Sequence, residues 1–117
     1  MAMRVFVFLA VLALYGASCA GAQTDDVRAG AVLFGKSGCP FCHGPAGMGT
    51  ERAPSLRDVH KRLNDEQIRH QIHDGGRMMP PFGEALTEDE IAQLSVFLRT
   101  KDAWHLVPPL DAPAAGK

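Results

Sequence analysis

Two cysteines and a histidine stand at a spacing that permits a specific covalent chemistry. Residues 38–44 read Gly-Cys-Pro-Phe-Cys-His-Gly, so Cys39 and Cys42 are three positions apart and His43 follows directly. This spacing is typical of the covalent attachment of a c-type haem. Each thiol adds to one vinyl group of the porphyrin, and a neutral imidazole nitrogen of His43 becomes a permanent ligand of the iron. The motif therefore predicts one covalently held haem c.

The same cysteines leave other chemistries open. Residues 31–38 can be interpreted as an apolar strand. Such a strand would lead into Cys39-Pro40-Phe41-Cys42, which is similar to the glutaredoxin redox motif. A secreted thiol–disulfide oxidoreductase would then use Cys39 as its nucleophile. Half of a zinc site is another alternative, although no second ligand pair follows at zinc spacing. No alternating strand pattern follows Cys42, whereas the fold of such oxidoreductases needs several strands, so haem is favoured.

A second candidate iron ligand lies in a loop of helix-breaking residues, Gly75 to Gly83. Pro80 biases Met79 toward an extended backbone, which can hold a thioether in one place. A thioether is a soft neutral donor suited to haem iron in an electron carrier. Adjacent side chains in an extended backbone point apart, so only Met78 or Met79 can bind. The alternatives are methionines that only fill gaps in the core, and a haem with an open sixth position.

A ligand histidine needs an acceptor for its other ring nitrogen. The loop of residues 44–54 is rich in glycine and proline and ends at Pro54. A backbone carbonyl of residues 54–56, most simply that of Pro54, is expected to accept the Nδ1 proton of His43. The sequence alone leaves the choice of carbonyl open.

Residues 1–22 have the pattern of an export signal. Arg4 precedes a ten-residue apolar core, Val5 to Leu14, which is too short to span a bilayer. Residues 20–22 read Ala-Gly-Ala, a small-x-small cleavage pattern, so the mature chain is expected to begin at Gln23 without a transmembrane segment. Cleavage there removes Cys19. A lipoprotein signal acylated at Cys19 is the alternative, but Gly16 stands where such signals usually carry leucine.

The composition excludes some classes of function. The 117 residues include 12 basic and 13 acidic side chains, for a net charge of −1, and form no basic stripe, so nucleic acid is not expected as a partner. The length allows one domain. A domain of this size buries only a modest core, and a covalently held apolar macrocycle would enlarge it.

The first expected helix precedes the cysteine motif. Thr24 is its expected N-cap, and Gly35 and Gly38 are expected to end it. Its apolar face includes Val27, Gly30, Ala31 and Phe34. Glycine inside a helix costs about 1 kcal/mol relative to alanine, so Gly30 on this face predicts the close approach of a second helix.

Two further helices carry start signals. Asn64 and Gln67 form a capping box, and Gly75 ends that helix. His70 and His73 on it are a possible metal pair, but solvent-facing histidines are favoured. Thr87 and Glu90 form the second box. The helix after Thr87 carries an apolar stripe of Ile91, Leu94 and Leu98, with Phe97 beside it.

The chain from about Val27 to Lys101 resembles class I c-type cytochromes, in particular the small bacterial members with one haem. The resemblance rests on a helix before Cys39-Pro40-Phe41-Cys42-His43, on Ala53-Pro54-Ser55-Leu56, on Met79-Pro80-Pro81-Phe82 and on a C-terminal helix after Thr87. It implies an all-α, small cytochrome c fold, with three to five helices wrapped around one covalently bound haem.

The resemblance also implies roles for single residues. Met79, which directly precedes a proline, is implied as the axial ligand rather than Met78, and the Pro54 carbonyl as the acceptor for His43. The first and last helices are implied to cross, with Gly30 and Phe34 against Leu94 and Phe97. The implied function is a periplasmic electron carrier, not an enzyme. The implied partners are redox proteins, namely a dehydrogenase, an oxidase or a respiratory complex, and the chain is expected to be a monomer.

Two features depart from the family pattern. The domain is expected to span residues 23–102, which leaves residues 103–117 as a proline-rich tail whose Trp104 is a candidate to pack back onto the domain. Arginines for the haem propionates are also not assigned by the pattern, and Arg52, Arg57 and Arg62 are the candidates.

Overall fold

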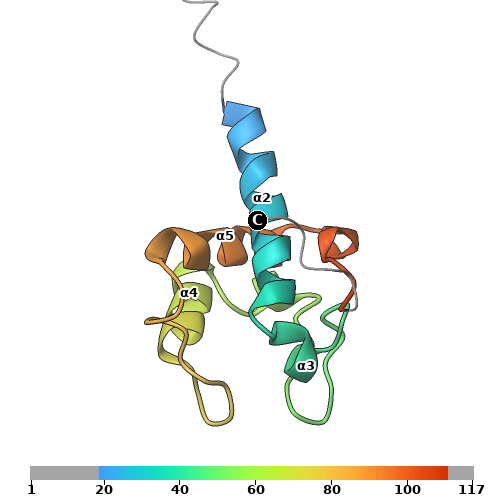
Figure 1. Cartoon of the computed structure of the whole chain (residues 1–117), viewed down its shortest axis with the longest axis vertical. Coiled ribbons are helices and arrows are strands. Elements are labelled where there is room, and N and C mark those ends of the chain that lie inside the picture. The colour runs from blue at the N-terminus through green and yellow to red at the C-terminus, as the bar shows by residue number, and fades with distance from the viewer. Residues whose placement is uncertain (1–18, 111–117) are drawn as a thin grey trace, which may run out of the picture.

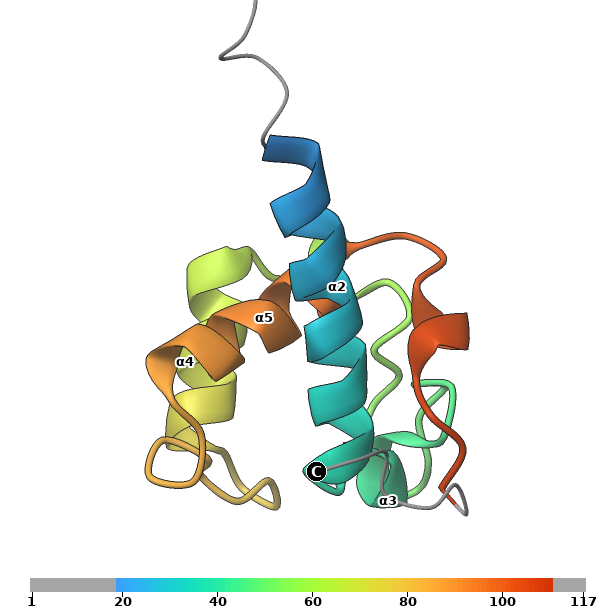
Figure 2. The same cartoon turned by 45° about the horizontal axis from the view of Figure 1, so that its top comes forward.

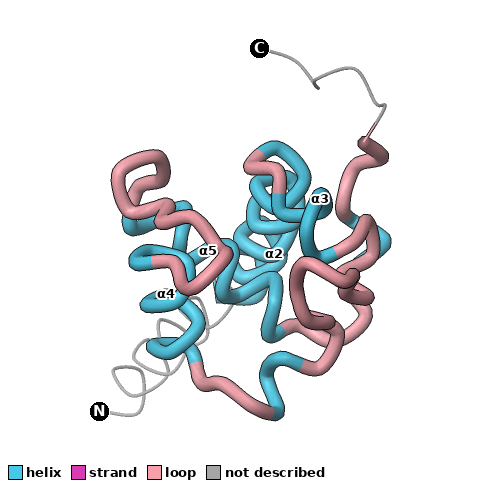
Figure 3. The backbone as a smooth tube through the Cα atoms, turned by 90° about the horizontal axis from the view of Figure 1, so that it is seen from below, coloured by secondary structure: helices cyan, strands magenta, loops and turns pink. Residues whose placement is uncertain are grey.

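The computed structural model describes residues 19–110, and this part of the chain is helical with no strand. The tube in Figure 3 alternates only between helix and loop. The elements are the α-helices α2 (Cys19–Lys36), α3 (Cys39–His43), α4 (Asp65–Asp74) and α5 (Glu88–Arg99), and the 3-10 helices η1 (Val59–Lys61) and η2 (Trp104–Leu106). The all-α prediction is confirmed.

Helices α2 and α5 cross at a glycine (Figures 1 and 2). A Cβ atom on Gly30 would lie 2.1 Å from the carbonyl oxygen of Gln93 and 2.6 Å from Cβ of Phe97. The ring centroids of Phe34 and Phe97 are 5.8 Å apart, and Leu94 is buried in the same core. The predicted close approach at Gly30 is therefore correct, because a side chain there would hold the backbones apart.

Both capping boxes predicted from the sequence are present. Asn64 accepts from the amide of Gln67 and Thr87 accepts from the amide of Glu90, and the side chains of Gln67 and Glu90 accept in return from the cap amides. Ile68 and Ile72 are the buried residues of α4, and α4 packs against α5.

Two predictions for α2 are wrong. The helix spans Cys19–Lys36, so Thr24 lies inside it rather than at its N-cap, because the alanines that precede Thr24 favour helical backbone. It ends at Lys36, so Gly35 does not terminate it, whereas Gly38 lies just beyond the end with a φ of +81°, as the prediction for Gly38 required. Gly35 instead faces Pro108, whose Cδ atom would lie 3.5 Å from a Cβ at this position.

The segment after α5 returns to the helices. Ala103 is 3% exposed, and the indole of Trp104 meets the rings of Phe34 and Phe97 at centroid distances of 5.3 and 5.0 Å, edge to face. The expected packing of Trp104 onto the domain is thus observed. The rest of the predicted tail, residues 111–117, lies outside the described residues, as do residues 1–18 of the predicted export signal. Among residues 19–110, no helix has the length and apolarity to cross a bilayer.

Candidate functional site

Helix α3 presents the two thiols and the imidazole from one turn of backbone. Gly38 caps its start, Pro40 occupies its first turn, and the amide of Gly44 closes it on the carbonyl of Pro40 at 2.9 Å. Cys39 and Cys42 are both free and partly exposed. His43 is the last residue of the helix, so all three functional groups move as one unit.

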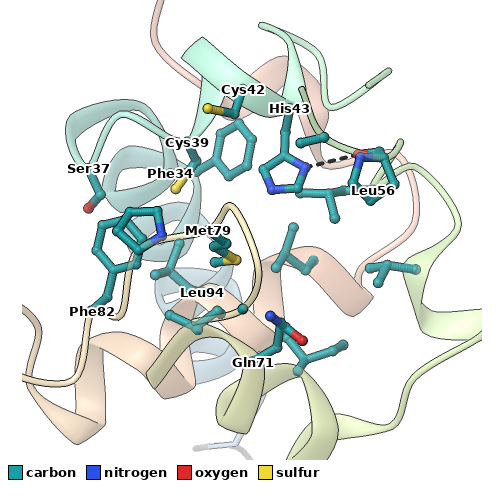
Figure 4. Close-up of a pocket in the computed structure, with 18 of the residues that line it drawn as sticks. Phe34, Ser37, Cys39, Cys42, His43, Leu56, Gln71, Met79, Phe82 and Leu94 are labelled. Atoms are coloured by element: carbon teal, nitrogen blue, oxygen red, sulfur yellow. Dashed lines mark hydrogen bonds between the residues drawn. The ribbon is translucent and has the colours of Figure 1, made fainter. Parts of the chain in front are cut away.

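The second ring nitrogen of His43 has a carbonyl partner. Nδ1 lies 2.9 Å from the Pro54 carbonyl oxygen, drawn as a dashed line in Figure 4. A carbonyl oxygen only accepts, so Nδ1 must donate and carries the proton of the neutral ring. The lone pair is then left on Nε2, which is the tautomer that a metal ligand needs.

A cavity of about 480 Å³ opens beside α3. Its size falls within the usual range for cofactor sites, about 300–1,000 Å³. Figure 4 shows Cys39, His43 and Met79 around it, with Phe82 and Leu94. Its apolar wall comprises Phe34, Leu56, Val59, Leu63, Ile68, Ile72, Phe82, Leu86, Leu94 and Leu98. Two thiols and an imidazole beside an apolar cavity fit a covalently attached haem c, and the Met79 thioether is available as a further iron ligand.

The two methionines of the 75–83 loop differ in exposure. Met78 is 76% exposed, whereas Met79 is partly buried and packs against the hydrophobic core. The loop is closed by hydrogen bonds from Gly76 to the Met79 carbonyl, from Phe82 to Ile72 and from Gly83 to His73, at 2.9 to 3.0 Å. The backbone at Met79 is therefore held at both sides. Both methionines line the cavity, and Met79 is the less exposed of the two.

Burial changes the acidity of the first cysteine. It raises the pKa of the Cys39 thiol to about 11, mainly through desolvation. A nucleophilic cysteine needs the opposite change, because only the thiolate attacks a disulfide. The environment of Cys39 therefore disfavours thiol–disulfide exchange.

The candidate arginines separate into two groups. Arg52 and Arg62 line the cavity, and an Nη of Arg62 also donates to the carbonyl of Ser55 at 2.7 Å. Arg57 is not among the cavity-lining residues. Its guanidinium instead lies 5.7 Å from the ring centre of Trp104, and its Nε donates to the Ala46 carbonyl at 2.7 Å.

Three polar residues that line the cavity were not predicted from the sequence. Ser37 follows α2, Gln71 lies on α4, and Arg77 precedes the methionine pair. Gln71 lies three residues after Ile68, so it is on the same face of the helix as the buried isoleucines. This spacing could have predicted from the sequence that Gln71 points toward the cavity.

The histidines of α4 bind a carboxylate. His70 and His73 lie 3.1 and 2.6 Å from the Asp74 carboxylate, and no group of three metal-binding side chains occurs within residues 19–110. The side chains of His70 and His73 are 74% and 45% exposed, so the solvent-facing interpretation agrees with the structure.

The fold and the donor set define a class I c-type cytochrome. Residues 25–98 match the model of the cytochrome c family described as "Cytochrome C oxidase, cbb3-type, subunit III", and the chain belongs to this family. Members of the family carry electrons on haem c and are not enzymes.

A solved structure is similar over most of the domain. It is the c-type cytochrome XoxG from Methylobacterium extorquens AM1, with 31% identity and a TM-score of 0.54. The match covers 67% of this chain and 52% of that one, so the similarity spans about half of XoxG. A comparison with proteins of curated function finds no match.

Proposed function

We propose that this chain is a periplasmic carrier of single electrons with one covalent haem c. Cys39 and Cys42 would form the two thioether bonds, and His43 and Met79 would be the protein ligands of the iron. When bound, the haem iron takes up and releases one electron. Ligation by methionine and histidine raises the reduction potential relative to two histidines.

The hydrogen bond between His43 and Pro54 is the observation that carries the proposal. It selects the tautomer with a free Nε2 and fixes the ring plane at the wall of an apolar cavity. A histidine that only stabilised the fold would have no reason to keep its remaining nitrogen toward an apolar space between two thiols and a thioether. The apolar wall would also exclude water from the iron, which disfavours loss of the thioether ligand.

Export and partners complete the proposal. Residues 1–22 would direct the chain to the periplasm, where thiols are joined to haem, and the electrons would pass to and from a dehydrogenase, an oxidase or a respiratory complex. The carrier would act as a monomer. We place its folded domain from residue 23 to about Val107, because Ala103 and Trp104 belong to the core.

The test is expression of the full-length chain with and without the cytochrome c maturation machinery. The expected product with the machinery is red, and its mass includes one haem that remains after denaturation. Replacement of both Cys39 and Cys42 by alanine should abolish this mass. A colourless product of unmodified mass, formed while a known cytochrome c matures in the same cells, would refute the proposal.

An open sixth position is the second candidate. In that state no methionine would be bound to the iron, and Met79 would be an unbound side chain in the cavity wall. An external ligand such as imidazole should bind the unmodified protein weakly or not at all if Met79 is bound, and readily if the position is open.

A further inference from the structure

The segment after α5 covers the loop that carries Pro54. The indole of Trp104 lies directly on Gly47, where a Cβ atom would stand 2.2 Å from the nearest ring carbon. Gly47 also has a φ of +66°, a conformation that favours glycine. No other residue fits beneath the indole with this backbone, so the loop and Trp104 are matched in shape.

The indole itself is fixed by the crossing helices. Its ring meets Phe34 of α2 at 82° and Phe97 of α5 at 71°, at centroid distances of 5.3 and 5.0 Å. Both phenylalanines are 1% exposed. Edge-to-face contacts on two buried rings leave the indole little freedom to shift.

Arg57 contacts both the indole and the start of the loop. Its guanidinium carbon lies 5.7 Å from the indole centre, and its Nε donates to the carbonyl of Ala46 at 2.7 Å. The side chain therefore joins the end of the loop to its start beside Trp104. This placement also explains why Arg57 does not reach the cavity.

Hydrogen bonds connect Gly47 with the neighbours of Pro54. The Gly47 carbonyl accepts from the amide of Leu56 at 2.8 Å and from the hydroxyl of Ser55 at 3.2 Å. Both donors lie within two residues of the carbonyl that holds His43. A displacement of Gly47 would therefore move the Pro54 carbonyl as well.

We propose that Trp104 and Arg57 are positioning residues for His43, which they keep in place through the loop of residues 44–57. This inference rests on the proposed function, because its consequence appears at the iron. The Pro54 acceptor increases the basicity of the imidazole, and a more basic ligand stabilises ferric iron. Release of the loop would weaken the hydrogen bond and raise the reduction potential.

The test compares Trp104→Ala and Arg57→Ala with the unmodified holoprotein. The first measurement is the exchange rate of the His43 Nδ1 proton in the reduced protein, followed by NMR. Both variants should accelerate this exchange by about tenfold or more, because opening of the loop exposes the proton to water. The second measurement is the reduction potential, which should shift upward in both.

Leu106→Ala is the matched control. Leu106 belongs to the same 3-10 helix and packs against the same core, so its loss lowers the stability of the segment. It should accelerate the exchange of the His43 proton and shift the potential much less than Trp104→Ala, because the indole stays on Gly47. Trp104→Phe, which keeps a ring on Gly47, should give an exchange rate and a reduction potential between those of Trp104→Ala and the unmodified protein.

The outcomes of these experiments distinguish failure of the inference from failure of the proposed function. Unchanged exchange and potential in the two alanine variants with haem attached would overturn the inference, and so would equal effects in Leu106→Ala. If Trp104→Ala does not fold, the exchange rate and potential of Arg57→Ala alone test the inference, because Arg57 is exposed and its substitution should leave the fold intact. A lack of covalent haem in the unmodified chain would instead refute the proposed function.

Discussion

Gly30 of α2 lies against the main-chain carbonyl of Gln93 in α5, and a Cβ atom at Gly30 would stand 2.1 Å from that oxygen. The obstacle is backbone rather than the end of a flexible side chain. The two helices can therefore keep this separation only while residue 30 has no side chain, and the crossing places Phe34 and Leu94 at the wall of the haem cavity.

Gly30→Ala should lower the free energy of unfolding by about 1–3 kcal/mol, since α2 and α5 must move apart. Urea denaturation of the holoprotein measures this change. Gly35→Ala is the control on the same helix, because its Cβ would meet Pro108 at 3.5 Å, an ordinary contact. That variant should be neutral or more stable by up to about 1 kcal/mol, as alanine favours helix over glycine. Equal destabilisation by both would contradict the close approach.

Met79→Ala should remove the absorption band of the methionine–ferric iron bond and allow external imidazole to bind. Met78→Ala is the matched control one residue away, and its spectrum should match the unmodified protein because the Met78 side chain is largely exposed. Visible spectra of the oxidised proteins distinguish the two. A spectrum that changes only in Met78→Ala would assign the ligand to the other methionine.

Asp65 joins α4 to α5 and makes stability depend on pH. It accepts from the buried Ser95 hydroxyl at 2.6 Å and pairs with Arg69 and Arg99 at 3.0 and 3.3 Å. The hydrogen bond from Ser95, followed by the two arginines, lowers the pKa of Asp65 below its usual value. Asp65 therefore stabilises the fold above the carboxyl's ordinary pKa, and this contribution is lost as the pH falls through its folded pKa.

Asp65→Asn should reduce the free energy of unfolding by about 1–2 kcal/mol at pH 7, a value discounted because the carboxylate is partly exposed. The difference from the unmodified protein should shrink as the pH falls below the ordinary pKa of Asp. Asp58→Asn, which breaks an exposed pair with Lys61, is the control and should change stability by less than about 0.5 kcal/mol. A difference for Asp65→Asn that stays constant down to acid pH would count against the ionised carboxylate.

His73 should titrate above its ordinary range. The hydrogen bond with Asp74, together with the charges of Asp74 and Glu88, raises the pKa of His73. Its protonated form thus stabilises the fold at a pH below the unfolded pKa, and this contribution disappears as the pH rises through the folded pKa. An NMR titration of the imidazole protons checks the value. Asp74→Asn should bring the pKa of His73 down toward the ordinary range, and no change in that variant would exclude Asp74 as the cause.

The sequence was sufficient for the features that depend on local chemistry. The cysteine–histidine motif, the capping boxes at Asn64 and Thr87 and the breakers around Met79 are signals within a few residues, and the helices begin where the boxes predict. The crossing at Gly30 was also predictable, because glycine on an apolar helix face has a cost that only a close contact offsets. The start of α2 was not predictable from the sequence. The small residues before Gln23 fit the end of an export signal, but they also fit the continuation of a helix.

Only the tertiary structure decided how distant segments divide their roles. Three arginines had equal standing in the sequence, yet Arg57 lies over Trp104 while Arg52 and Arg62 line the cavity. The Pro54 carbonyl was likewise one of several acceptors until the fold brought it to His43. Neither choice is visible along the chain, because each depends on long-range contacts among Gly47, Trp104 and the crossing helices, whereas sequence periodicity records only which face of one element is buried.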